Sequence, residues 1–181
     1  MNLKNLYIKF KSYYILYFKG GSSYAKYIGA NIGENCRVYT KNFGSEPFLI
    51  TIGNNVTITS GVKFITHDGS TWLMRDFKGR RFLYQKIFLK NNIFIGVNSI
   101  ILPGVVIEDN VIVAAGSVVT KSIPSGVIVA GVPAKIIGDY SDYKIKILNN
   151  YVSEADLDLT INYEQRILKV LDNSHKEYLK K

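Results

Sequence analysis

The chain has 181 residues, of which 47% are hydrophobic and 20% charged, and its formal net charge is +9. This composition is typical of one globular domain with a sizeable core. A single cysteine excludes an internal disulfide and a cysteine-rich zinc site, and two histidines exclude a metal site built from three histidines of one chain. The excess of lysine and arginine favours anionic partners, but no nucleic-acid recognition motif accompanies it, so we expect no nucleic-acid partner.

Residues 1–27 mix tyrosine, isoleucine, leucine and lysine and contain no acidic residue. We predict that they form a helix or strand that caps the repeats that follow. The apolar run Tyr13–Phe18 is too short for a membrane span, which needs about 20 residues. Lysines also interrupt any signal-peptide pattern, so we expect a cytoplasmic protein. Peripheral association of this segment with a membrane surface is the minor alternative.

From Ile32 onward the chain repeats every six residues, in the blocks Ile32–Phe43, Ile52–Gly69 and Leu89–Pro124. The first residue of each six is Ile, Leu or Val, with Phe64 as the exception, and the fifth is often Val, Cys or Ser. A period of six fits neither a helix nor a plain strand. It predicts a prism with three short strands per coil and parallel pairing between coils. We expect the first residue of each six to point inward and the fifth to sit at a corner, where Gly, Asn and Asp tolerate the left-handed backbone.

The six-residue count is interrupted twice, at Gly44–Thr51 and at the long excursion Ser70–Phe88. Counting coils places the first interruption beside the repeat Phe64–Gly69, so we expect Glu46 to lie near His67. A histidine with an adjacent carboxylate is a general base suited to neutral pH. Glu46 and Asp68 are both candidates for the carboxylate. Long excursions from a regular scaffold are usually functional or form interfaces.

After residue 138 the repeat is lost. Apolar residues recur at roughly helical spacing between Thr160 and Lys181, which predicts a helix there. The second histidine, His175, belongs to this region, and we expect it to be exposed and inert.

The runs IGNNVTITSGVKFITHDGS and IGVNSIILPGVVIEDNVIVAAGSVVTKSIPSGVIVAGVPAK, with the excursion between them, resemble the hexapeptide-repeat acetyltransferases that use acyl-CoA. That family includes sugar O-acetyltransferases of capsule and O-antigen pathways, maltose and galactoside acetyltransferases, and xenobiotic acetyltransferases. The resemblance implies a mainly β fold, a left-handed parallel β-helix over residues 28–137 with an excursion loop at 70–88. An N-terminal cap (1–27) and a C-terminal helical extension (138–181) would flank it. The left hand comes from the resemblance, because parallel crossovers are otherwise right-handed.

The resemblance also implies an activity. The chain would transfer acetyl from acetyl-CoA to a sugar hydroxyl, in surface polysaccharide biosynthesis, as a homotrimer without an acyl-enzyme or a metal. His67 would be the base, Glu46 or Asp68 would orient it, and Trp72 and Arg75 in the excursion would contact the acceptor. The residues placed at acetyl-CoA by the resemblance are Phe94, Gly96, Ala115, Gly116, Thr120, Lys121 and Lys135.

Three alternatives remain open at this point. In two of them the fold and the donor are the same, and the acceptor is either the amine of an amino sugar or sugar nucleotide, or an antibiotic. From a different class, the repeats would form a non-catalytic scaffold, which needs neither His67 beside an excursion nor the VVTK and GVPAK elements.

Overall fold

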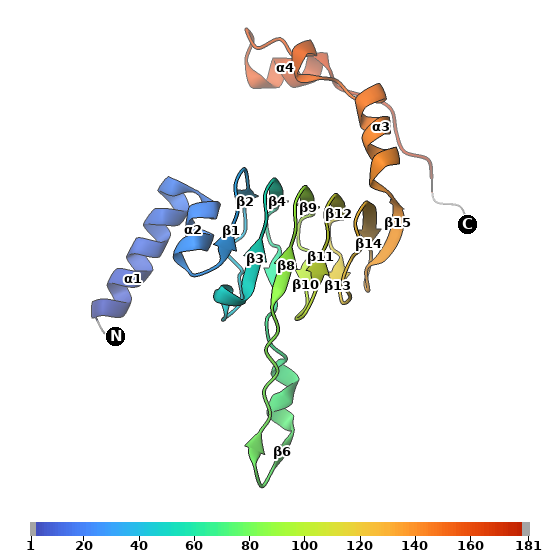
Figure 1. Cartoon of the computed structure of the whole chain (residues 1–181). Helices are drawn as coiled ribbons and strands as arrows, with labels where there is room; N and C mark the ends of the chain where they lie inside the picture. Colours follow the sequence, from blue (N-terminus) through green and yellow to red (C-terminus); the bar gives the residue numbers. More distant parts are fainter. Residues whose placement is uncertain (1–2, 179–181) are drawn as a thin grey trace. The chain divides into compact units, whose positions relative to one another are not determined.

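The structure is a computed structural model that describes residues 3–178, so Met1, Asn2 and residues 179–181 of the predicted termini lie outside the described part. The chain divides into two compact units, Met1–Ser141 and Asp142–Lys181. The first unit contains the repeats, which wind into stacked three-sided coils (Figure 1).

Three sheets form the sides of this prism, and the strands from successive coils pair in parallel. Side A contains β1 (Asn31–Ile32), β3 (Ile50–Ile52), β8 (Ile87–Leu89) and β11 (Val106–Ile107). Side B contains β2 (Arg37–Val38), β4 (Val56–Ile58), β9 (Ile93–Ile95), β12 (Val111–Val113) and β14 (Val127–Ala130). Side C contains β5 (Lys63–Phe64), β10 (Ile100–Ile101) and β13 (Val118–Val119). Ile52 aligns with Leu89 and Ile58 with Ile95, so equivalent positions of the repeat lie above one another, as the sequence predicts.

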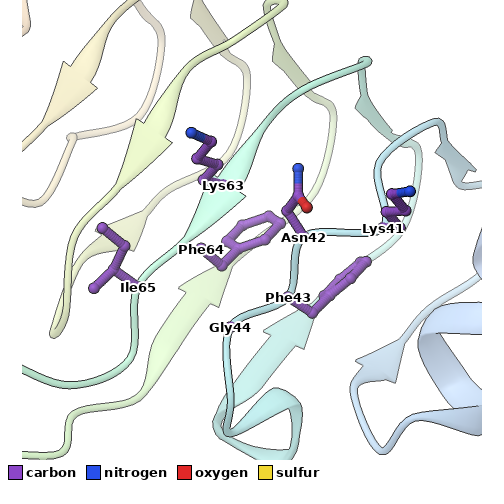
Figure 2. Close-up of a pocket in the computed structure, with 7 residues that line it drawn as sticks. All are labelled: Lys41, Asn42, Phe43, Gly44, Lys63, Phe64 and Ile65. Atoms are coloured by element: carbon purple, nitrogen blue, oxygen red, sulfur yellow. The ribbon is translucent and has the colours of Figure 1, made fainter.

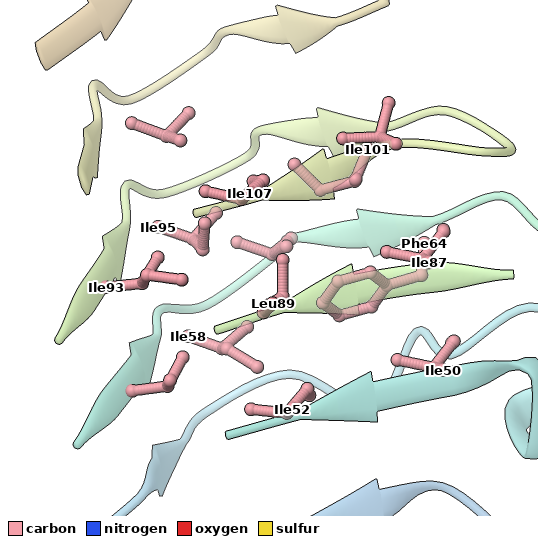
Figure 3. Packing of buried hydrophobic residues seen from close by; sticks show 14 of the residues in the cluster. Ile50, Ile52, Ile58, Phe64, Ile87, Leu89, Ile93, Ile95, Ile101 and Ile107 are labelled. Carbon is pink, nitrogen blue, oxygen red and sulfur yellow. The ribbon is translucent and has the colours of Figure 1, made fainter. Parts of the chain in front are cut away.

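A continuous column of aliphatic side chains fills the prism (Figure 3). Ile58, Ile95 and Ile101, each the first residue of its six, are fully buried. Complete burial of one such side chain contributes about 1.5–3 kcal/mol to folding. The column therefore holds each coil on its neighbours.

The structure refines the corner prediction. The fifth residue of the six, such as Val62 or Ser99, is buried inside the prism. The corner is made by the fourth residue, an asparagine or glycine with positive φ, for example Asn55 at 57° and Gly61 at 74°. A small fifth residue is favoured because its side chain points inward just after the turn, where the adjoining sides converge.

At the corner between sides A and B, the asparagines form a ladder. The Asn35 amide donates to Asn55 Oδ1 at 2.6 Å, Asn55 donates to Asn92 Oδ1 at 3.1 Å, and Asn92 donates to Asn110 Oδ1 at 3.2 Å. Each rung joins one coil to the next and offsets the strain of the left-handed backbone.

The N-terminal segment is helical. It contains α1 (Leu3–Tyr14), a π-helical turn, η1 (Ile15–Lys19), and α2 (Gly21–Tyr27). The start of α2 lies on the open end of the first coil, because Ser22 Oγ donates to the Cys36 carbonyl at 2.8 Å. A Cβ on Gly21 would come within 1.9 Å of the Val38 carbonyl oxygen, so only glycine permits this approach. Helix α2 thus covers the edges of first-coil strands, which would otherwise be exposed.

At the other end of the stack, β15 (Lys135–Asp139) pairs antiparallel with β14 and protects its edge. The second unit contains most of α3 (Tyr140–Asn150), the short turn η4 (Glu154–Asp156) and α4 (Tyr163–Lys169). The helix predicted for Thr160–Lys181 is therefore confined to α4 within the described residues. Beyond it, Asp172 Oδ1 accepts from the Ser174 backbone N–H at 2.8 Å, a local turn that competes with helix formation.

Within residues 3–178, no helix combines the length and the apolar character needed to cross a membrane.

Candidate active site

Both interruptions of the repeat leave the prism at the corner between sides C and A. The excursion projects from this corner between β5 and β8 and ends in a hairpin of β6 (Arg75–Asp76) and β7 (Gly79–Arg80) (Figure 1). Its base is a short antiparallel stem, in which His67 pairs with Tyr84 and the Gln85 N–H donates to the Thr66 carbonyl at 2.9 Å. His67 is therefore held by backbone pairing on both sides.

Glu46 reaches this stem from the neighbouring coil. The segment Gly44–Thr51 contains a 3-10 turn, η2 (Pro47–Leu49), which begins directly after Glu46. Gly44 makes the approach to the next coil feasible, because a Cβ there would lie 2.9 Å from the Phe64 carbonyl oxygen. The structure places Glu46 Oε2 2.9 Å from His67 Nδ1.

Thr66 completes this cluster, and sequence reasoning missed it. Its side chain is 1% exposed, and its hydroxyl donates to the same Glu46 Oε2 at 2.6 Å. These two hydrogen bonds, Thr66 first and His67 second, hold the pKa of the Glu46 carboxyl below its ordinary value. The coil count that brings Glu46 to His67 also brings it to Thr66, so the signal was present in the sequence.

The ionised Glu46 carboxylate has consequences for the histidine ring. A carboxylate only accepts hydrogen bonds, so Nδ1 of His67 must carry the proton that lies between them. In the neutral ring, Nε2 then keeps its lone pair and can accept a proton from a bound hydroxyl. His67 is 37% exposed at its side chain, whereas Glu46 is 17% exposed, so the imidazole is accessible and the carboxylate is sheltered.

Asp68, the second candidate for the carboxylate partner of His67, forms hydrogen bonds with Ser70. Its Oδ1 accepts from the Ser70 N–H at 2.8 Å and from the Ser70 hydroxyl at 2.7 Å, and it caps the 3-10 helix η3 (Gly69–Leu73). These bonds to Ser70 lower the pKa of the Asp68 carboxyl. Asp68 therefore fixes the beginning of the excursion, and the carboxylate hydrogen-bonded to His67 is that of Glu46.

A pocket of about 420 Å³ opens beside His67. Its wall combines the stem of the excursion with the same corner of the next two coils. The lining residues are Ile65, His67, Asp68, Gly69, Leu83, Gln85, Leu102, Pro103 and Thr120. Thr120, expected near acetyl-CoA, is thus in the pocket, and Lys121 follows it as an exposed residue. Leu83 and Gln85 were not foreseen, because the return strand of the excursion has no repeat pattern.

Trp72 and Arg75 do not line this pocket. The Arg75 guanidinium lies 4.2 Å from the centre of the Trp72 ring, and that of Arg80 lies 5.0 Å from it. The Arg80 guanidinium also lies 4.6 Å from the centre of the Phe82 ring. Trp72, Phe82, Arg75 and Arg80 thus form a cation–π cluster within the excursion. Within this chain, none of these four residues lines the pocket beside His67.

The other residues expected at acetyl-CoA lie away from the corner of His67. Gly96, Ala115 and Gly116 lie at the corner between sides B and C, where a Cβ on Gly96 would be 2.4 Å from the Ala115 nitrogen. Phe94 is on the outer face of side B, 40% exposed and aligned with Ile112. Lys135 is exposed on β15. The structure therefore divides the expected set between two corners of the prism, the outer face of side B and β15.

A second pocket, of about 370 Å³, lies on side C of the first two coils and shares Ile65 with the first. Figure 2 shows the Lys41 and Lys63 side chains and the rings of Phe43 and Phe64, all of which line this pocket. These rings stack at 5.3 Å and belong to the core. Among the described residues, no group of three or more His, Cys, Asp and Glu side chains is placed to hold a metal ion.

A stack of three-sided parallel coils with a carboxylate–histidine pair at one corner is the architecture of a hexapeptide-repeat acyltransferase. The comparisons agree, and the chain belongs to the left-handed β-helical hexapeptide-repeat acetyltransferase family. The family described as "Bacterial transferase hexapeptide (six repeats)" matches residues 86–121. Protein CapG of Staphylococcus aureus is 50% identical over 153 residues, which cover 83% of this chain and 86% of that protein.

Other relatives are more distant. The galactoside O-acetyltransferase of Escherichia coli K12 is 34% identical over 127 residues, which cover 70% of this chain and 59% of that enzyme. A solved structure of a hexapeptide-repeat acetyltransferase from Vibrio cholerae, complexed with acetyl coenzyme A, has a TM-score of 0.51 and 27% identity, covering 62% of this chain and 61% of that one. Family membership makes the chain an acetyltransferase rather than a non-catalytic scaffold.

Proposed function

We propose that the chain transfers an acetyl group from acetyl-CoA to a hydroxyl of a sugar, in surface polysaccharide biosynthesis. The observation that carries this proposal is the Glu46–His67 pair, 2.9 Å apart, at the mouth of a pocket. The galactoside O-acetyltransferase relative supports a sugar acceptor, and the related structure with acetyl coenzyme A supports the donor.

The reaction needs one proton carrier and no acyl-enzyme. His67 Nε2 takes the proton of the acceptor hydroxyl as its oxygen attacks the thioester carbonyl. Glu46 stabilises the resulting imidazolium through Nδ1 and keeps the ring oriented. When the tetrahedral intermediate collapses, the carbon–sulfur bond breaks, and the imidazolium returns the proton to the leaving sulfur. The products are the acetyl ester and free CoA, and His67 is neutral again.

The division of the expected acetyl-CoA residues between two corners supports a site shared by subunits. Thr120 and Lys121 lie at the corner of His67, whereas Gly96, Ala115 and Gly116 lie at the next corner of the same prism. A trimer would bring the second corner of one subunit to the first corner of its neighbour. We therefore propose a homotrimer with acetyl-CoA between subunits.

The test is acceptor-dependent release of CoA thiol from acetyl-CoA. The acceptors are galactosides, other sugars, amino sugars, sugar nucleotides and a chloramphenicol-like alcohol. We expect release with a sugar hydroxyl and a loss of about 10²–10⁴-fold in His67→Ala, the range for removal of a general base. His175→Ala is the matched control and should retain full activity. Activity confined to an amino sugar or to the antibiotic would overturn the sugar-hydroxyl assignment, and an unaffected His67→Ala variant would overturn the mechanism.

A further inference from the structure

The N-terminal helices carry a surface that takes no part in the core. Tyr7, Phe10, Tyr14, Tyr17 and Phe18 expose between 55% (Tyr14) and 77% (Phe18) of their area. Tyr7, Phe10 and Tyr14 are spaced by three and four residues, and Tyr17 and Phe18 follow Tyr14 by three and four, which places all five on one face of the helix. Stacking of Tyr14 on Phe18, with ring centres 5.0 Å apart, continues this face from α1 into η1.

The core contacts of this segment are made by other residues. Ile15 is 8% exposed and Ala25 is fully buried, and Ala25 belongs to the core cluster of the first coil. Capping of the prism therefore does not depend on the aromatic face. Large exposed apolar patches on a folded protein mark a site of interaction with a partner or a membrane.

All charged side chains in the N-terminal segment are positive. The first acidic residue of the chain is Glu34, and five lysines precede it. Lys11 and Lys19 are exposed on the same helices as the aromatic side chains, and neither takes part in a salt bridge among the described residues. Lys11 lies 5.6 Å from the centre of the Tyr27 ring. We call Tyr7, Phe10, Tyr14, Tyr17 and Phe18, with Lys11 and Lys19, the aromatic–lysine surface.

We infer that the aromatic–lysine surface docks the protein on an anionic lipid membrane, with α1 and η1 lying in the interface and not crossing it. Tyrosine favours the membrane–water boundary because its ring is apolar and its hydroxyl is polar. Lysines beside the rings are attracted to anionic headgroups. A second copy that met this surface with its own N-terminal segment would fit less well, because two acid-free, lysine-bearing segments would then come together.

The experiment is co-sedimentation of the full chain with vesicles of equal parts phosphatidylglycerol and phosphatidylcholine, compared with vesicles of phosphatidylcholine alone. We expect clear preference for the anionic vesicles, weakened by salt. Lys11→Gln/Lys19→Gln should weaken binding about 25-fold at low salt, since each lysine near the surface contributes about fivefold. Phe10→Gln/Tyr14→Gln/Phe18→Gln should weaken it at least about tenfold.

Matched control variants remove equal numbers of lysines and of aromatic residues elsewhere. Lys144→Gln/Lys146→Gln and Tyr39→Gln/Tyr151→Gln/Tyr163→Gln alter exposed side chains outside the aromatic–lysine surface and should bind as the wild type does. Circular dichroism verifies that each variant is folded. Equal binding to both vesicle types, or unchanged binding of both surface variants, would overturn the inference. A surface variant that keeps vesicle binding but has a smaller mass by light scattering would assign the surface to a second copy instead. Vesicle binding requires no acetyl transfer, so the inference is independent of the proposed function.

Discussion

Replacing Thr66 by valine tests whether the buried Thr66 hydroxyl, acting through Glu46, positions His67, the proposed general base. Valine has nearly the shape of threonine, so the substitution removes a hydroxyl and leaves no cavity. The lost bond joins a side chain that is 1% exposed to the ionised Glu46 at 2.6 Å. A hydrogen bond to a charged group contributes about 1.5–3 kcal/mol. If all of it acts on the transition state, kcat/KM falls about 10- to 150-fold.

Thr40→Val is the matched control for this effect. Thr40 is 3% exposed, and its hydroxyl donates to the Val62 carbonyl at 2.7 Å, away from Glu46. Urea unfolding should show a similar loss of stability, about 1–3 kcal/mol, in both variants, whereas only Thr66→Val should lose activity in the thiol-release assay. Thr66→Ser keeps the hydroxyl and should restore most of the rate. Equal activity of Thr66→Val and Thr40→Val would refute the positioning role of Thr66.

Three further outcomes are expected. Because its two hydrogen bonds lower the pKa of Glu46 from 4.5, their stabilisation is complete above that pH and lost as pH falls through the lower, folded value. Wild type should therefore lose its stability advantage over Glu46→Gln progressively as the pH falls below about 4.5 in urea titrations. Asn55→Ala should be about 1 kcal/mol less stable than Asn55→Gly, since both lose the ladder but only alanine is strained at φ 57°. Gly96→Ala, whose Cβ would lie 2.4 Å from the Ala115 nitrogen, should cost about 1–3 kcal/mol, whereas Gly69→Ala, with open space around it, should be neutral by thermal unfolding.

The fold could be predicted because the repeat determines both the path of the chain and its pairing. A residue such as Ile58 has one choice of orientation, inward, and the parallel partner Ile95 follows from counting whole coils. The same count predicted that Glu46 and His67 lie on one corner. Sequence could not decide between Glu46 and Asp68, because that choice depends on the local turn in which Asp68 bonds Ser70 instead.

The remaining differences concern segments outside the repeat. The expected C-terminal helix was too long, because periodicity does not register the Asp172–Ser174 turn that competes with it. The Arg75 guanidinium lies over the Trp72 ring in the excursion, and the contact of these two residues with the acceptor stays a prediction. Within an excursion, no count of coils relates a residue to a position in space.

The location of the candidate site follows from how the corners differ. At the corner between sides A and B, repeats run without interruption, and the asparagine amides are satisfied by one another from Asn35 to Asn110. Such a corner stabilises the stack, and its asparagine amides are occupied with one another. At the corner between sides C and A, the two interruptions replace the ladder. A carboxylate from the first interruption meets there the imidazole of the last repeat before the second interruption. In a chain of this construction, a base is therefore to be sought where the count of six fails on two successive coils at the same corner.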